Sequence, residues 1–403
     1  MLVPLMEAVS DTCGGKAGAL GALLREGLPV PDGFVVPFVA YLAAVRDLDL
    51  ESDDLGATRI EARPVHATVI DALGRALDEL GDPPVAVRSS AANEDTGQAS
   101  AAGQHESFLA VHGVSEVADA VRACWASLFS ARAIDYRGAS GRDDLVMAVI
   151  VQRHLDAEVS GVMFTPADPN DATQIEASWG LGPSIVGGKV TPDAYRVAEG
   201  GSVTRTVADK RTRLDRRGTQ LVIRDVPTRT RNQPAIDDAT ATRLAKLGKE
   251  IAAVLGGPQD IEWAIVDGRT WVLQARPVTA APPPPPSPSG ASDTPAATLT
   301  GTPGSRGTVT GTARIVRGPG DFARVHPGDI LVCPFTDPAW TPLLRIAAGV
   351  VTETGGVLSH AAIVAREHAI PAVLGIPNAT SRLHDDTIIT IDGTTGTVTP
   401  ADA

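Results

Sequence analysis

The sequence predicts an α/β (α+β) protein of two domains, and three observations support this prediction. A chain of 403 residues is too long for one comfortable hydrophobic core. Residues 280–298 include five consecutive prolines, Pro282 to Pro286, and such a segment forms an extended linker instead of a packed core. On both sides of it, Val- and Ile-rich stretches typical of strands stand beside Ala- and Leu-rich stretches typical of helices. We therefore expect one domain over residues 1–279 and a second over residues 299–403.

The amino-acid composition of the chain limits the classes of molecule that it is expected to bind. The net charge of −13 opposes non-specific binding to nucleic acid or to an anionic membrane. The cysteines Cys13, Cys124 and Cys333 are far apart and lack the spacing of metal ligands, so we interpret them as reduced thiols. The chain opens without a charged and then apolar leader, and no apolar run approaches the roughly 18 residues of a membrane span. We therefore expect a cytoplasmic protein with neither nucleic-acid nor membrane partners.

The first motif lies near the N-terminus. Gly14 and Gly15 precede an Ala- and Leu-rich segment that begins with Lys16. This pattern predicts a helix whose start lets the backbone approach a phosphate, with one mobile cation at hand. Glycine-rich helix starts are common and the P-loop spacing is missing, so the motif alone does not specify a nucleotide site.

A short β-branched strand beginning at Val85 should deliver Arg88 and two serine hydroxyls into a loop. A guanidinium presented in this way is suited to binding phosphate. An ion pair of Arg88 with Glu94 or Asp95 at the strand end would explain the same residues. Residues 126–137 predict a helix, and Arg132 on its surface would ordinarily be only solvated.

Residues 259–277 predict a β-hairpin that gathers polar groups. Alternation places Asp260 and Glu262 on one face of the first strand, and an Asp-Gly turn returns a second strand with Gln274 and Arg276 on one face. Carboxylates and an amide oxygen suit Mg²⁺, and Arg276 could neutralise the charge of a transferring phosphoryl group. A hairpin with one solvated face would alternate in the same way.

The C-terminal region contains the candidate nucleophile. Gly355 and Gly356 predict a sharp turn, followed by a helix with Ser359 as its N-cap. His360 would then lie in the first helical turn, where free N–H groups and the helix dipole stabilise a phosphate on the ring. A neutral imidazole is a competent nucleophile at pH 7. A first-turn His that only hydrogen-bonds a neighbouring carbonyl fits the spacing equally well. The remainder of residues 299–403, rich in Val, Ile, Thr and Gly, suits a compact β/α domain.

The segment PAWTPLLRIAAGVVTETGGVLSHAAIVAREHAIPAVLG, residues 338–375, closely resembles the swivelling phosphohistidine domain of the phosphoenolpyruvate-utilising enzymes. This family includes pyruvate phosphate dikinases and phosphoenolpyruvate synthases. The resemblance implies that His360 carries the phosphoryl group. In those enzymes Thr usually stands two residues before the His, whereas this chain has Leu358, which puts pyruvate as the acceptor in doubt.

Residues 1–279 resemble the ATP-grasp-type nucleotide-binding domain of the same family, most clearly in the segments that contain Arg88 and the predicted hairpin. The resemblance implies that Gln152 lies near the adenine, while Glu176 either faces the sugar or merely ends a strand. It implies Glu262 and Gln274 as the Mg²⁺ ligands, and His360 and Arg276 as catalytic residues. The full set of implied ATP contacts is Lys16, Arg88, Arg132, Gln152, Glu176, Asp260, Glu262, Gln274 and Arg276.

The activity implied is that of an ATP-dependent, dikinase-like phosphotransferase with Mg²⁺. His360 would be phosphorylated by ATP, and a swivelling domain would carry the group to a small-molecule alcohol, phenol or enol, with release of AMP and phosphate. Neither a pyruvate-binding barrel nor the antibiotic-binding domain of rifampin phosphotransferases is recognisable. We therefore expect the acceptor site between the domains or on a separate subunit, as in phenylphosphate synthases. An ATP-grasp ligase and a non-catalytic regulator are the alternatives, and a phosphorylated rather than a coupled product would exclude the ligase.

Overall fold

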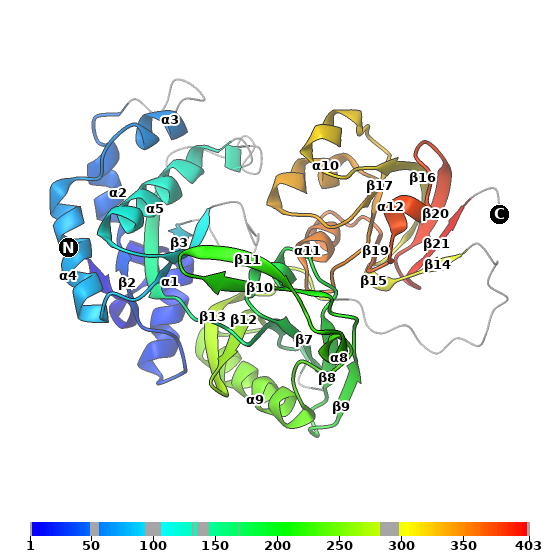
Figure 1. Ribbon diagram of the computed structural model, residues 1–403, viewed down its shortest axis with the longest axis horizontal. Helices are drawn as coiled ribbons and strands as arrows, with labels where there is room; N and C mark the ends of the chain where they lie inside the picture. The colour runs from blue at the N-terminus through cyan, green and yellow to red at the C-terminus, as the bar shows by residue number, and fades with distance from the viewer. Residues whose placement is uncertain are drawn as a thin grey trace.

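The computed structural model describes residues 2–48, 56–92, 106–130, 133–134, 145–168, 170–282 and 298–400. Its strands form three main sheets, of five, six and eight strands, and a separate two-stranded ribbon. Figure 1 shows the eight-stranded sheet at one end of the molecule, drawn yellow to red, and the six-stranded sheet between it and the N-terminal elements. Arg132 and most of the predicted proline-rich linker lie outside the described residues. Within the described part of the chain, no helix combines the length and the apolar composition of a membrane span.

The five-stranded sheet has the order β1-β2-β5-β3-β4 and is antiparallel throughout. Helices α2, α4 and α5 pack on one face through Tyr41, Leu73 and Trp125, all buried. Helix α1 covers the opposite face through Leu20 and Leu23. The elements are β1 (Val3–Pro4), η1 (Leu5–Glu7), α1 (Ser10–Arg25), β2 (Gly33–Val36), α2 (Phe38–Val45), α3 (Gly56–Glu61), α4 (Ala67–Leu80), β3 (Val85–Ala91), β4 (Ser107–Val111), α5 (Val114–Ala126), η2 (Ser127–Phe129) and β5 (Met147–Arg153).

The six-stranded sheet has the order β13-β12-β6-β7-β8-β9 and is also antiparallel. Alternation gives it one apolar face, where Ile175, Ile261 and Trp263 pack against helix α9. The α9 helix begins after Asp237, whose carboxylate accepts from Thr240 N at 2.8 Å. The elements are β6 (Val159–Phe164), β7 (Thr173–Trp179), α7 (Pro183–Val186), β8 (Asp193–Val197), β9 (Val203–Thr206), α8 (Thr228–Arg231), α9 (Asp238–Leu255), β12 (Gln259–Val266) and β13 (Arg269–Pro277), with the ribbon β10 (Thr212–Arg217) and β11 (Gln220–Asp225) between β9 and α8.

The hairpin expected over residues 259–277 is present as β12 and β13. Asp267 and Gly268 form its turn, and both have positive φ angles, of 50° and 72°. Asp260 pairs with Arg276 and Glu262 pairs with Gln274 across the strands, so all four side chains share one face as predicted.

The eight-stranded sheet is built from residues 299–400 in the order β14-β21-β20-β16-β17-β18-β19-β15, with β16 to β19 parallel. Helix α11 follows the parallel strand β18, and the loop between them lies at the carboxyl end of that strand, where sites in parallel sheets commonly form. The elements are β14 (Leu299–Thr300), β15 (Thr302–Ser305), β16 (Thr308–Ile315), η3 (Pro319–Arg324), β17 (Ile330–Cys333), η4 (Pro338–Trp340), α10 (Thr341–Ile346), β18 (Gly349–Thr352), α11 (His360–Glu367), β19 (Ala372–Leu374), α12 (Ala379–Arg382), β20 (Ile388–Asp392) and β21 (Thr397–Pro400).

An apolar cluster joins the C-terminal residues to the second face of the six-stranded sheet. Val162 and Phe164 of β6 pack with Leu358 and Ile363, which flank His360 in the chain. Figure 1 shows α11 on the side of the C-terminal part that faces the green six-stranded part. The face of the sheet opposite α9 therefore carries both the predicted polar hairpin residues and the contact with the His360 loop.

Candidate active site

The second face of the six-stranded sheet carries a row of cross-strand neighbours. Gln274 on β13 pairs with Glu262 on β12, Glu262 pairs with Val162 on β6, and Val162 pairs with Glu176 on β7. Neighbouring strands lie about 4.8 Å apart, so this row spans four strands within about 15 Å. Three predicted site residues that are far apart in the sequence thus share one surface.

Arg88 extends from the five-stranded sheet to this row. Its Nη2 donates to Gln274 Oε1 at 2.5 Å and lies 3.3 Å from Glu262 Oε2, while Nη1 donates to the carbonyl of Leu273 at 2.5 Å. The guanidinium is largely buried between the two sheets, with its side chain 13% exposed. Arg88 therefore pairs with hairpin residues, and Glu94 and Asp95, the partners considered from the sequence, lie outside the described residues.

The start of α1 lies against the strand that carries Arg88. Gly14 is non-helical, with φ of 80°, and a Cβ there would lie 2.3 Å from the carbonyl oxygen of Ser90. The Ser90 hydroxyl accepts from Ala17 N at 3.1 Å. Lys16 thus lies in the first turn after a break that only glycine permits, and this turn is fixed to β3 two residues beyond Arg88.

Gln152 lies on β5, on the same face of the five-stranded sheet as Arg88, because it pairs with Ala86, two residues before Arg88. The side chain is buried and its Nε2 donates to the carbonyl of Pro31 at 3.0 Å. The structure therefore gives Gln152 a backbone contact that ties β5 to the segment before β2. Its expected proximity to an adenine stays a prediction.

Asp260 and Arg276 form a buried ion pair next to the row. Arg276 Nε and Nη2 lie 2.9 and 2.8 Å from Asp260 Oδ2, and both side chains are less than 10% exposed. Burial raises the pKa of Asp260, and the positive charge of Arg276 opposes this increase. Because the pair is buried, these residues are not on a solvated hairpin face, the alternative that the alternation had left open.

His360 is the first residue of α11, as predicted, and it is buried. Its Nδ1 lies 2.9 Å from Thr336 Oγ1, and its Nε2 lies 3.4 Å from Thr341 Oγ1. Ser359 occupies the N-cap position, but its hydroxyl donates to the carbonyl of Gly356 at 2.8 Å and does not cap the helix. Ser359 is therefore the N-cap residue as predicted, while its hydroxyl bonds within the Gly355-Gly356 turn.

The charge of His360 follows from its surroundings. Burial lowers its pKa to about 4, and the positive charge of Arg276 acts in the same direction. The imidazole is consequently neutral at pH 7 and lies within the electrostatic reach of Arg276. No carbonyl accepts from the ring in the described part of the structure, which disfavours the purely structural interpretation of this His.

Glu176 contacts the C-terminal residues and not an open surface. It is fully buried on β7, and its Oε2 accepts from Leu358 N at 3.3 Å. Gly356 lies so close that an added Cβ would stand 2.2 Å from Glu176 Oε1. In this arrangement the carboxyl group contacts the loop before His360. Glu176 lies within β7 and does not end the strand, and its expected position facing the nucleotide sugar stays a prediction.

Glu262 and Gln274 provide a pair of oxygens suited to a hard cation. Both oxygens converge on one cationic nitrogen, Arg88 Nη2. Among the described residues, there is no group of three or more His, Cys, Asp or Glu side chains that could hold a metal. The residues therefore fit Mg²⁺, which usually takes few protein ligands and completes its shell with water and substrate phosphate.

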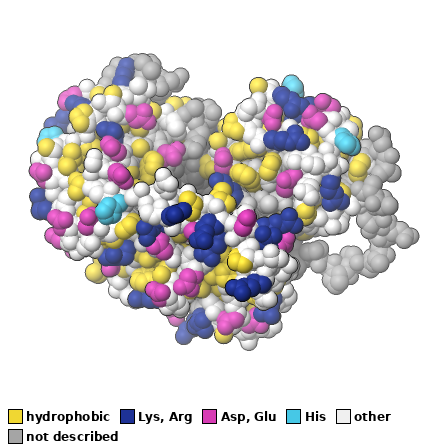
Figure 2. All heavy atoms as spheres, viewed as in Figure 1, with side chains coloured by type: hydrophobic (Ala, Val, Ile, Leu, Met, Phe, Trp, Pro, Cys, Tyr) yellow, Lys and Arg dark blue, Asp and Glu magenta, His cyan; other side chains and the backbone are white. Residues whose placement is uncertain are grey.

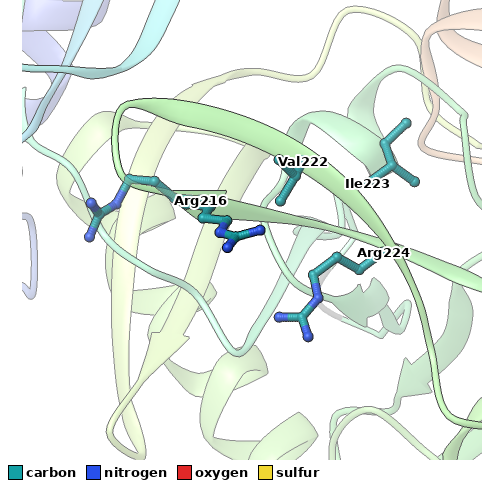
Figure 3. Close-up of a pocket in the computed structure, with 5 residues that line it drawn as sticks. Arg216, Val222, Ile223 and Arg224 are labelled. Atoms are coloured by element: carbon teal, nitrogen blue, oxygen red, sulfur yellow. The ribbon is translucent and has the colours of Figure 1, made fainter.

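A separate hollow lies beside the β10–β11 ribbon. It has a volume of about 590 Å³ and is lined by Arg216, Arg217, Val222, Ile223 and Arg224. Figure 3 shows four of these side chains projecting from the ribbon, and Figure 2 shows Lys and Arg side chains gathered over this part of the surface. Arg216 pairs with Asp156 and Arg224 lies 3.7 Å from Asp215, so aspartates already neutralise much of this charge. The hollow is not lined by the predicted site residues.

Reasoning from sequence missed three residues that contact the site. Thr336 and Thr341 contact the ring of His360, and Arg366 of α11 donates from Nη1 to the carbonyls of Gly304 and Val357. The proximity of Thr341 to the glycine loop in the sequence was a usable signal. Thr336 follows a buried strand with no motif around it, and only the three-dimensional fold identifies it.

Known families match both parts of the chain. Residues 10–288 match the family described as pyruvate phosphate dikinase, AMP/ATP-binding domain, and residues 325–396 match the one described as PEP-utilising enzyme, mobile domain. A probable phosphoenolpyruvate synthase of Methanothermobacter thermautotrophicus is 38% identical over 96% of this chain and 61% of its own length. A probable phosphoenolpyruvate synthase of Archaeoglobus fulgidus and the phosphoenolpyruvate synthase of Pyrococcus furiosus are 36% and 33% identical, each over 96% of this chain and 56% of the relative.

This chain therefore spans between 56% and 61% of the length of these curated relatives. The matched regions contain every predicted site residue, with the ATP contacts in the first region and His360 in the second. The chain belongs to the family of ATP-dependent, phosphoenolpyruvate-utilising dikinases, with an ATP-grasp-type nucleotide-binding domain followed by the mobile domain of that family.

Proposed function

We propose that this protein is an ATP-dependent phosphotransferase that phosphorylates its own His360 and passes the phosphoryl group to the hydroxyl of a small molecule. The observation that carries this proposal is the position of His360. A neutral, buried imidazole lies at the start of a helix, beside Arg276 and on the side of the sheet that holds Glu262 and Gln274.

The nucleophile in this reaction is His360 Nε2. When Nδ1 carries the ring proton and donates a hydrogen bond to Thr336 Oγ1 at 2.9 Å, the attacking lone pair is on Nε2, which lies 3.4 Å from the Thr341 hydroxyl. Attack on the β-phosphorus forms an N–P bond while the P–O bond to AMP breaks in line, which leaves two phosphoryl groups on the ring. Transfer of the terminal group to water then releases phosphate and leaves the phosphohistidine. The first-turn N–H groups of α11 and the charge of Arg276 favour the negative phosphoryl group at this place.

The nucleotide would lie between the five-stranded and six-stranded sheets. Lys16 and Arg88 come from one side, and Glu262 and Gln274 come from the other. Phosphates would compete with Gln274 and Glu262 for the Arg88 guanidinium, which now holds the two oxygens together. Bound Mg²⁺ would supply charge neutralisation for the phosphates, with Glu262 and Gln274 as its protein ligands.

The acceptor is proposed as a small alcohol, phenol or enol. Relatives named as phosphoenolpyruvate synthases support the enol class, since phosphoenolpyruvate is an enol phosphate. AMP and phosphate are the expected by-products.

Nucleotide analysis tests this proposal. Protein incubated with ATP, Mg²⁺ and a panel of small hydroxyl compounds should produce AMP and phosphate, with a phosphorylated compound in one mixture. His360→Ala should abolish AMP formation while ATP binding remains. ADP as the only nucleotide product, or equal AMP formation by the His360→Ala variant, would contradict the proposal.

A further inference from the structure

Glu176 lies where the nucleotide-binding domain meets the loop that leads to His360. Its carboxyl oxygen accepts from Leu358 N, two residues before His360, at 3.3 Å. Thr354, at the start of the same loop, donates from Oγ1 to the carbonyl of Gly188 at 2.6 Å. Two polar contacts from the nucleotide-binding domain therefore hold this loop, one near each end.

Steric fit points to the same pair of segments. The three atoms nearest to a Cβ added at Gly356 all belong to the Glu176 carboxyl group, at 2.2 to 2.5 Å. The φ angle of Gly356 is not in the left-handed region, so an alanine there would be compatible with the backbone. Gly356 is therefore required because the Glu176 carboxyl group occupies the space of a side chain, and not because of the backbone conformation.

We propose that Glu176 is a positioning residue for the phosphoryl transfer proposed above: its carboxyl group seats the loop of residues 355–358 and thereby fixes His360 opposite the nucleotide site. This inference rests on the proposed function for its chemical consequence, but the seating itself requires no nucleotide. Glu176 touches neither the ring of His360 nor the hairpin oxygens, so it acts only through the loop.

The electrostatic surroundings of Glu176 make this seating depend on pH. Burial raises its pKa from the ordinary value of 4.5 to about 7. Hydrogen bonds from Leu358 and Val357 and the positive charge of Arg366 lower the pKa, but the effect of burial is larger. Its cross-strand neighbours, Val162 and Ala194, carry no charge. Four other charged groups lie close to the interface. Asp260 and Glu367 act on Arg366, and Arg276 acts on His360. Lys189 lies over the Phe335 ring.

The sign of the pH dependence follows from this shift. When the loop leaves, Glu176 meets water and its pKa returns towards 4.5. Between these two pKa values the Glu176 carboxyl binds more protons in the seated state than in the released state, so its contribution to seating is largest at the acid side and weakens as pH rises from about 5 to about 7. His360 contributes with the opposite sign below pH 6.5, because burial lowers its pKa, so the contribution of Glu176 is measured as the difference between the wild type and Glu176→Gln. Above that range the cost of burying the carboxylate is constant.

Four variants test the inference, with Gly320→Ala as the matched control. Gly320 is in the same domain as Gly356, and a Cβ there has nothing within 4 Å. The extent of seating is measured without nucleotide, from the radius of gyration in solution and from hydrogen exchange of the Leu358 amide. Self-phosphorylation and ATP binding are measured in parallel.

Gly356→Ala should release the loop and slow self-phosphorylation about tenfold or more, as overpacking of a tight contact does. Glu176→Ala should also release it. The double variant should be no worse than Glu176→Ala alone, because the clash is removed. Glu176→Gln should keep the acceptor for Leu358 N, retain seating at pH 6, and lose the weakening between pH 5 and 7. ATP binding should be unchanged in Gly356→Ala and in Gly320→Ala.

Two results would overturn the inference. The first is that Gly356→Ala reduces seating in the Glu176→Ala background as much as it does in the wild type. The second is that seating in Glu176→Gln depends on pH as it does in the wild type. The second result needs no variant with altered packing, so a folding defect of Gly356→Ala cannot obscure the outcome. Normal seating behaviour without any self-phosphorylation would instead contradict the proposed function and support the role of Glu176 in seating.

Discussion

His360 illustrates how the surroundings of one residue can set its chemistry. In water the imidazole would be partly protonated near neutral pH, but at this position its pKa is lowered to about 4, first by burial and then by Arg276. Two threonine hydroxyls supply the polar contacts that a buried ring needs. The environment that destabilises the protonated imidazole therefore keeps a lone pair on the ring, as the proposed attack on phosphorus requires.

Thr336 should hold the reactive tautomer of His360. Thr336→Val retains the shape of the side chain but removes the partner of Nδ1, so we expect self-phosphorylation to slow about tenfold, as the loss of one buried hydrogen bond would do. ATP binding should not change. Thr310→Val removes an exposed hydroxyl of the same domain and serves as the control. An unaffected rate in Thr336→Val would show that the hydroxyl does not orient the ring.

The pH dependence provides a second test at this scale. The pKa of His360 is lower in the seated state than in water, so seating favours the neutral imidazole. Above pH 6.5 the ring is neutral in both states and its protonation does not oppose seating. As pH falls from 6.5 towards 4, protonation of the released state makes seating progressively less favourable. The acid limb of the self-phosphorylation rate should therefore lie below pH 6.5. An acid limb centred at or above 6.5 would indicate that His360 reacts while exposed to water.

The β12–β13 hairpin is the element on which the site depends most. Alternation and the Asp-Gly turn were sufficient to predict the hairpin and its strand faces, because both are local in sequence. The register shift between Glu262 and Trp263, which places Glu262 opposite Gln274, was not predicted. The contact of Arg88 with Gln274 was not predictable in this way, since it joins strands of different sheets. The same is true of Glu176, whose partner Leu358 lies 182 residues away. Local pattern therefore predicted the strand faces, and the packing of the sheets determined which faces meet.

The two polar residue pairs of the hairpin should respond differently to substitution. Gln274→Ala should leave the protein folded and slow self-phosphorylation about a hundredfold, as the loss of one electrostatic contact to a transferring group does. Arg276→Ala also leaves Asp260 buried without its partner, which should cost about 3–5 kcal/mol of unfolding free energy. In Asp260→Asn/Arg276→Ala, thermal denaturation should show recovered stability without recovered activity. Wild-type phosphorylation by that double variant would remove Arg276 from the mechanism.

At the scale of the whole molecule, the proposed nucleotide site and the proposed nucleophile lie on separate domains. The seated arrangement joins them through the apolar cluster around Leu358 and the contacts of the 354–359 loop. A phosphohistidine in this position lies against the nucleotide-binding domain, so delivery to an acceptor elsewhere requires the mobile domain to leave. The proline-rich linker that would allow this lies mostly outside the described residues and stays a prediction.

An engineered disulfide tests this requirement. A Cβ at Gly188 would lie 3.5 Å from Ser359 Cβ, within the range of disulfide geometry, and the native cysteines in the described structure are buried. Cys at the φ angle of 61° found at Gly188 should cost about 1 kcal/mol. The oxidised Gly188→Cys/Ser359→Cys variant should accept one phosphoryl group and then stop, and reduction should restore turnover. Full multiple turnover in the oxidised state would contradict domain movement.

Phosphorylation of His360 itself is the central claim, and one labelling experiment tests it most directly. Wild-type protein, His360→Ala and His368→Ala are incubated with Mg²⁺ and ATP labelled at the β-phosphate, and labelled peptides are mapped. His368 ends the same helix and provides the matched control. We predict an acid-labile, base-stable label on His360 in the wild type and in His368→Ala, and none in His360→Ala. A label that persists in His360→Ala, or that maps to another residue, would contradict the account.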